Sequence, residues 1–205
     1  MTQGPQVDIY VGPEKKHYKI PKRLLCANSN YFTACFEGGF VEAKAQQLEL
    51  NEDKVNEWEI LLEFMFSGKV KKNKLSFPES NTADQQLQSC MGFIEYTDKY
   101  NLGGACMAIH DCLMECLEVL VENDTIDKYL KGSDIELVFR AAPEESQIRK
   151  LIVQAAMACA SSRFKDQEKR CDGFAAEVLA QLRGGEHHTT WSNPLMDENT
   201  RDRYS

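Results

Sequence analysis

Two short stretches near the N-terminus place apolar side chains at every second position, as β-strands do. They cover residues 7–11 and 17–20. Gly12 and Pro13 break the first stretch, and a polar turn follows them. The second stretch ends at Pro21, because proline has no N–H to donate to a sheet ladder. The pattern predicts a β-hairpin, and the alternation of Leu48 and Leu50 with polar neighbours predicts a third strand.

Helical periodicity follows the hairpin. One short helix is predicted around Leu24 and Leu25, and a second spans about 31–36, with Asn28 or Ser29 as its cap. We expect glycines 38 and 39 to end the second helix, because glycine tolerates the left-handed conformation of a helix end. Apolar residues then recur at i, i+3, i+4 and i+7, which predicts longer helices. These carry residues 58–65, 87–94, 109–120, 135–139, 148–159 and 174–182.

Polar segments separate and follow these helices. Residues 69–86 are predicted to form a loop, with room for one short strand at its start. Two pairs have the spacing of a capping box: Thr82 with Gln85, and Ser133 with Glu136. Residues 186–205 are polar and lack periodicity, which predicts a disordered tail.

Residues 5–121 thus follow the order β-β-α-α-β-α-(β)-α-α. The strands are too few and too short to enclose a core, so helices must cover them, and the helical hairpin at about 58–120 supplies much of the burial. The prediction is an α+β fold, a small sheet flanked by a cluster of helices. The chain of 205 residues is divided into this domain at 5–121, a helical C-terminal extension at 122–183 and the tail at 184–205.

The charge balance excludes two classes of partner. Lysine and arginine number 24 against 32 aspartates and glutamates, which gives a net charge of −8. We therefore expect no general nucleic-acid binding and no docking on an anionic membrane. No apolar run reaches the ~20 residues of a membrane span, and the N-terminus does not resemble a signal peptide. We expect a cytoplasmic or nuclear protein whose eight cysteines are reduced.

The strongest candidate for metal or redox chemistry is the segment with Cys106, His110, Cys112 and Cys116. On one helix, the first two lie on a different side from the last two, so the helix cannot gather all four. Cys112 and Cys116 fall within the apolar stripe and are predicted to be buried thiols. The sequence has no Cys-x-x-Cys pair, nucleophile elbow, phosphate loop or dinucleotide fingerprint. We expect no metal, no cofactor and no enzymatic activity.

Three further features each have two interpretations. The four lysines between 69 and 74 are predicted to form a solvated hinge, the alternative being contact with an acidic partner or RNA. His187 and His188 are interpreted as part of a solvated tail rather than a transient metal site. Trp191, near Pro194 and Leu195, is either a short docking motif or an aromatic residue without a role.

Several short strings over residues 5–121 together resemble a BTB/POZ domain. They are VDIYVG at 7–12, YKIPKRLL at 18–25, SNYF at 29–32, FEGGFVE at 36–42, LEL at 48–50, residues 58–68 and YTDKYNL at 96–102. The Gly-Pro-Glu turn and the GGF-x-E string are similar to those of short BTB proteins of filamentous fungi, and residues 146–151 resemble their C-terminal extension. One departure is Pro21, which stands before Lys22 where the family usually has histidine.

The resemblance implies a protein–protein interaction module, and in many members the partner is a cullin scaffold of a ubiquitin ligase. Cullin-binding members carry a hydrophobic-x-Glu motif in the loop after the second helix, and Phe40-Val41-Glu42 matches it. An aromatic anchor would fill a pocket while the acid beside it orients the partner. In the alternative interpretation, Phe40 packs over the domain edge and Glu42 is solvated.

The resemblance also implies self-association, because BTB dimers form largely through the first two helices and the N-terminal strand. Here Leu24, Leu25, Tyr31 and Phe32 are the candidate contacts. Only six residues precede the first strand, so we expect a homodimer, if formed, to have a smaller interface than those with an exchanged N-terminal extension. The leading hypothesis is a ligase adaptor whose helices at 133–182 meet the substrate. The alternative is a self-associating scaffold or regulator without a ligase link.

Overall fold

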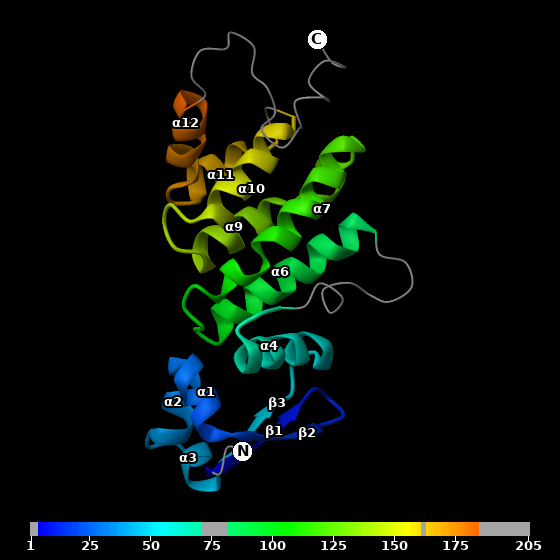
Figure 1. Cartoon of the computed structure of the whole chain (residues 1–205). Coiled ribbons are helices and arrows are strands. Elements are labelled where there is room, and N and C mark those ends of the chain that lie inside the picture. Colours follow the sequence, from blue (N-terminus) through cyan, green and yellow to red (C-terminus); the bar gives the residue numbers. More distant parts are fainter. Residues whose placement is uncertain (1–3, 71–81, 161–162, 185–205) are drawn as a thin grey trace.

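The computed structural model describes residues 4–70, 82–160 and 163–184 (Figure 1). The tail beyond 184, the lysines at 71, 72 and 74, and Trp191 lie outside these residues. The described elements are β1 (Gln6–Val11), β2 (Lys16–Pro21), α1 (Lys22–Asn28), α2 (Asn30–Glu37), α3 (Val41–Ala45), β3 (Gln47–Leu50), α4 (Val55–Ser67), α6 (Ala83–Lys99), η1 (Ala105–Ile109), α7 (His110–Glu122), α8 (Ile126–Tyr129), α9 (Gly132–Ala141), α10 (Gln147–Ala158), α11 (Lys165–Arg170) and α12 (Phe174–Gly184).

The predicted hairpin and third strand are confirmed. They form one mixed sheet in the order β2-β1-β3. Strand β1 pairs antiparallel with β2, with Ile9 opposite Tyr18, and parallel with β3, with Ile9 opposite Leu48. The apolar residues of β1 are completely buried on one face. Helix α4 covers that face, where Trp58 meets the Tyr18 ring edge-on with 6.4 Å between ring centroids.

Three buried aromatic rings join helices that are distant in the sequence. Phe32 of α2 stacks on Tyr100, just after α6, with 5.1 Å between ring centroids. Trp58 of α4 meets both rings edge-on at 5.9 Å. All three side chains are fully buried, and each such ring stabilises the fold by roughly 1.5–3 kcal/mol relative to an exposed one. This cluster holds α2 against α4 and the end of α6.

The predicted helices are confirmed, but one of the two expected end signals of α2 works differently. Ser29, one of the two predicted caps, accepts a hydrogen bond from the Phe32 N–H at 3.2 Å. Gly38 ends α2 in an extended conformation with φ −78°, rather than the predicted left-handed one. Glycine is needed there for space, because a Cβ atom would lie 2.3 Å from the Ala34 carbonyl oxygen.

Neither predicted capping box is present. Thr82 precedes α6 but makes no side-chain cap hydrogen bond, and the helix starts at Ala83 within the expected loop. Helix α9 begins one residue before Ser133, and the Lys131 N–H donates to the Asp134 carboxylate at 2.8 Å. Helices α3, α8 and α11 were not predicted, because each has at most six residues and no sustained apolar stripe.

Helices α6 and α7 lie between the sheet at one end of the molecule and α9 to α12 at the other (Figure 1). Helix α9 packs on α6, and α10 packs on α7, α9 and α12. The Phe139 and Phe174 rings meet edge-on at 5.5 Å and close this end of the core. The domain boundary near 121 stays a prediction. None of the described helices has the length and apolarity to cross a membrane.

Candidate functional site

Two large apolar side chains project from the surface where α2 gives way to α3. Phe40 is 62% exposed and Val41 is 72% exposed. The expected position of the motif was a loop, whereas Phe40 is the N-cap of α3 and Val41 and Glu42 form its first turn. Glu42 is half-buried. The structure therefore presents an aromatic and an aliphatic side chain to solvent, with a carboxylate on the same short helix.

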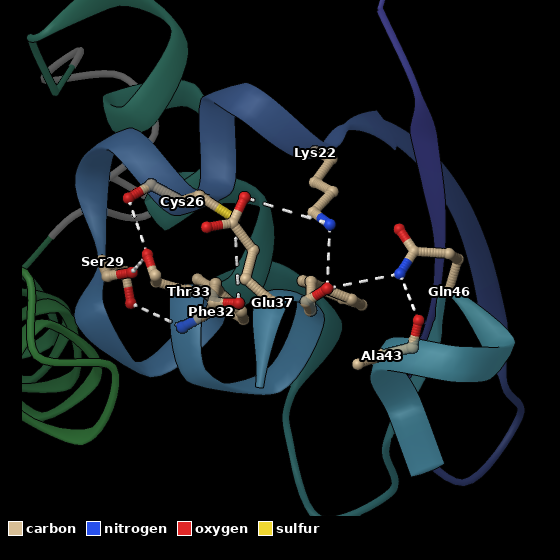
Figure 2. A network of polar contacts seen from close by, with 9 residues as sticks. Lys22, Cys26, Ser29, Phe32, Thr33, Glu37, Ala43 and Gln46 are labelled. Carbon is tan, nitrogen blue, oxygen red and sulfur yellow. Dashed lines mark hydrogen bonds and ion pairs between the residues drawn. The ribbon is translucent and has the colours of Figure 1, made fainter. Parts of the chain in front are cut away.

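A network of polar contacts joins the end of α2 to α1 and to the end of α3, on either side of the exposed pair (Figure 2). Lys22 of α1 donates to the Phe36 carbonyl at 2.8 Å and pairs with Glu37 at 3.9 Å. Gln46, just after α3, donates to the same Phe36 carbonyl at 3.3 Å. These bonds tie α1, the end of α2 and the end of α3 together, so the exposed pair is carried on a braced segment.

The α2 face near Glu42 carries Tyr31 and Cys35. Burial raises the pKa of Tyr31 to about 12, and the neighbouring Cys35, Asp53 and Glu42 act in the same direction. Burial also raises the pKa of the Cys35 thiol, and the charge of Glu42 adds to that effect. Both groups are therefore neutral near pH 7. The surface combines exposed apolar groups, a carboxylate, a hydroxyl and a thiol, which suits recognition of a protein.

The four predicted self-association residues divide into two pairs. Leu25 and Phe32 are completely buried within the single chain, so neither side chain is available to a second copy. This corrects their place among the candidate contacts, because both are needed to pack α1 and α2 against the core. Leu24 and Tyr31 are partly exposed and stay candidates for such a contact.

The cysteines of the candidate metal segment lie in the core. Cys106, Cys112 and Cys116 are buried, which confirms the prediction for the last two. Hydrogen bonds with Cys112 and Cys116, together with burial, raise the pKa of the neighbouring Cys90 thiol. His110 interacts with Asp111 at 3.0 Å instead. Within the described ranges, no group of three or more histidine, cysteine or acidic side chains is arranged to hold a metal.

Sequence reasoning missed the exposure of Val41, which exceeds that of Phe40. It also missed the buried carboxylate of Asp53, which accepts hydrogen bonds from Lys99 and Tyr100. Val41 occupies the variable position of the hydrophobic-x-Glu motif, so the motif itself gives no signal for its exposure. The partners of Asp53 are 46 and 47 residues away, so only the folded chain reveals them.

Comparison with known families identifies the N-terminal part of the chain. The model of the BTB/POZ domain matches residues 1–98. Together with the mixed three-stranded sheet and the helices around it, this match shows a BTB/POZ fold with a helical extension. BTB domains mediate protein–protein interaction and dimerisation and are generally not enzymes. No curated protein matches the chain.

Proposed function

We propose that this protein is a BTB adaptor that docks on a cullin scaffold of a ubiquitin ligase through Phe40 and Glu42. The observation that carries the proposal is the exposure of Phe40 and Val41 at the position where the resemblance places the cullin motif. The helices from about 133 to 182 would then form the surface that binds the substrate. The protein would act in the cytoplasm or the nucleus. We also propose that the protein is related to the short BTB proteins of filamentous fungi.

The physical basis is the contrast between an exposed anchor and a fixed backbone. Burying the phenyl ring in a partner's pocket removes apolar surface from water, which favours association. The bonds from Lys22 and Gln46 to the Phe36 carbonyl already order this segment, so it loses less conformational entropy on binding than a flexible loop would. Glu42 supplies a charge-assisted hydrogen bond that fixes the partner's orientation.

The test is a calorimetric titration of the full chain with a cullin N-terminal domain. Phe40→Ala is expected to weaken binding by more than about 1 kcal/mol, which is at least fivefold in Kd. Glu42→Gln is expected to weaken it in the same direction. Phe66→Ala is the matched control, because Phe66 is 59% exposed on α4, and its affinity should equal that of the wild type. Equal affinities for all variants would refute the assigned contact.

Self-association through α1 and α2 is the second candidate function. It is favoured by the partial exposure of Leu24 and Tyr31 next to the α1–α2 pair. Leu24→Glu would place a charge in such an interface and is expected to convert a dimer to a monomer in sedimentation velocity. A wild-type chain that is monomeric at tens of micromolar would exclude this candidate at that concentration.

A further inference from the structure

Helix α12 carries apolar side chains on more than the face that it buries. Phe174 is buried and Val178 packs against the core, so these two residues define its inward face. On the adjoining side, Leu179 is 50% exposed and Leu182 is 53% exposed. Together with Ala175 they have the i, i+4, i+7 spacing of a single helix face. We call these three residues the α12 stripe.

The neighbouring helices do not cover the α12 stripe. Helix α12 packs on α10 and α11, and Figure 1 shows it at the end of the molecule opposite the sheet. Among the residues that the structure describes, these contacts bury Phe174 but leave both leucines of the stripe about half exposed to solvent. Two neighbouring leucines on one helix face form an apolar surface that another segment can cover.

The size of the α12 stripe indicates which occupant suits it. A stable complex between separate chains buries about 800 Å² on each partner. Two half-exposed leucines and one alanine offer far less than that, so the stripe alone is too small to hold a free partner or a second copy. A segment of the same chain needs less surface, because a short tether gives it an effective concentration in the millimolar range.

The sequence directly after α12 contains apolar residues that match the stripe. In the mostly polar stretch 185–205, Trp191, Leu195 and Met196 lie close together. Trp191 follows Gly184 by seven residues, which can extend over at most about 23 Å. The α12 stripe is only about 10 Å long at the rise of an α-helix. The tether is therefore long enough for Trp191 to reach any part of the stripe.

A cation lies beside the α12 stripe. Arg183 follows Leu182 and is exposed, and its side chain has no hydrogen bond or ion pair with the described part of the chain. Asp197 and Glu198 come directly after Met196. Apolar contact of the segment with the stripe would bring these carboxylates near the Arg183 guanidinium, which favours charge-assisted hydrogen bonds.

We propose that residues 191–196 bind the α12 stripe of the same chain. Trp191 covers the exposed leucine side chains, and the two carboxylates that follow the segment face Arg183. Trp191 then has the docking role that was one of its two interpretations, with α12 as its partner. Phe40 lies on α3 at the opposite end of the molecule (Figure 1), so the inference does not rest on the cullin contact.

The first experiment measures quenching of tryptophan fluorescence by iodide on the full chain. Trp58 is completely buried, so quenching by this hydrophilic ion reports Trp191. Leu179→Asp is expected to raise the quenching constant at least about threefold, because the segment loses its apolar contact and its tether alone no longer holds it. Arg183→Glu should raise it by a smaller factor. Val119→Asp is the matched control, since Val119 is 42% exposed on α7, and it should leave quenching unchanged.

The second experiment measures hydrogen exchange of the α12 amides. Trp191→Ser is expected to speed their exchange at least about threefold, because the helix loses the segment that covers it. Tyr204→Ser is the matched control, since Tyr204 is the other aromatic residue after α12, and it should leave the exchange unchanged. This experiment keeps the proposal testable if circular dichroism shows that Leu179→Asp does not fold.

Protection of Trp191 from iodide that is independent of protein concentration and lost in Leu179→Asp would support the proposal. Equal quenching of the wild type and a folded Leu179→Asp variant would overturn it, as would unchanged exchange of the α12 amides in Trp191→Ser. Protection that grows with protein concentration would also overturn it, because the occupant would then come from a second copy.

Discussion

The Tyr100 hydroxyl donates a hydrogen bond to the buried carboxylate of Asp53. This bond joins the end of α6 to the turn between β3 and α4. Lys99 donates to the other carboxylate oxygen, so a charged group that is 3% exposed has a cation and a hydroxyl as partners. Burial, together with the hydrogen bond to Asp53, raises the pKa of Tyr100 far above its usual range, so the phenol stays a donor at every physiological pH.

Tyr100→Phe is expected to lower the free energy of unfolding by about 1–3 kcal/mol, because the Asp53 oxygen then stays buried without its donor. The measurement is urea denaturation followed by circular dichroism. Tyr10→Phe serves as the control, since Tyr10 lies on the outward face of the sheet, and a change within about 0.5 kcal/mol is expected there. Equal effects of the two substitutions would contradict the structural role of the Tyr100–Asp53 bond.

Ser29 and Ser146 both cap helices, but only Ser29 has a second bond. Its hydroxyl accepts from the Phe32 N–H and donates to the Tyr100 carbonyl at 2.5 Å, whereas Ser146 accepts from the Arg149 N–H. Ser146→Ala is expected to cost about 1 kcal/mol of unfolding free energy. Ser29→Ala is expected to cost roughly 2–3 kcal/mol, because a buried carbonyl also loses its donor. Chemical denaturation measures both losses. If Ser29→Ala loses no more unfolding free energy than Ser146→Ala, the second hydrogen bond of Ser29 does not contribute as expected.

Alanine substitutions at the adjacent Gly38 and Gly39 are expected to change stability by different amounts. Gly38→Ala places a Cβ 2.3 Å from the Ala34 carbonyl oxygen, whereas a Cβ on Gly39 meets nothing within 4 Å. We expect Gly38→Ala to destabilise the protein by about 1–3 kcal/mol and Gly39→Ala to change stability by less than about 0.5 kcal/mol. Thermal melts of the two variants check this pair. Similar Tm values would mean that the α2–α3 connection relaxes freely and does not brace Phe40.

Glu118 on α7 is expected to make the stability of the fold depend on pH. Burial raises its pKa, and the charges of Glu122 and Glu115 add to the effect. Because the folded state then holds the proton more tightly than the unfolded chain, stability from this group is present at acid pH and is lost as the pH rises through the raised pKa. Glu118→Gln should therefore have a higher Tm than the wild type at pH 7. At pH 4 the difference should vanish, and a constant difference at both values would refute the effect.

The sequence predicted those parts of the fold that depend on periodicity. The three strands and the long helices follow from alternation and from apolar stripes, because burial of one face dictates both patterns. Helix ends were harder to predict. The pair Thr82 and Gln85 has the spacing of a capping box, yet Thr82 makes no such bond. At α9 the cap comes from Asp134, two residues before Glu136.

The candidate site was only partly visible in the sequence. Its position followed from the resemblance of residues 36–42 to a BTB motif, and the exposure of Phe40 depends on how α3 meets α2. That packing rests on Lys22 and Gln46, whose bonds converge on one carbonyl from positions 24 residues apart in the chain.

The most direct test of the cullin proposal is light scattering after size-exclusion chromatography. The full chain is measured alone and mixed with a cullin N-terminal domain at tens of micromolar, and the Phe40→Ala and Phe66→Ala variants are measured in the same way. We predict a stable complex whose mass is the sum of the two components for the wild type and for Phe66→Ala, and its weakening or loss for Phe40→Ala. Absence of a complex with the wild type, or an equally stable complex with Phe40→Ala, would contradict the assignment of Phe40 as the docking anchor.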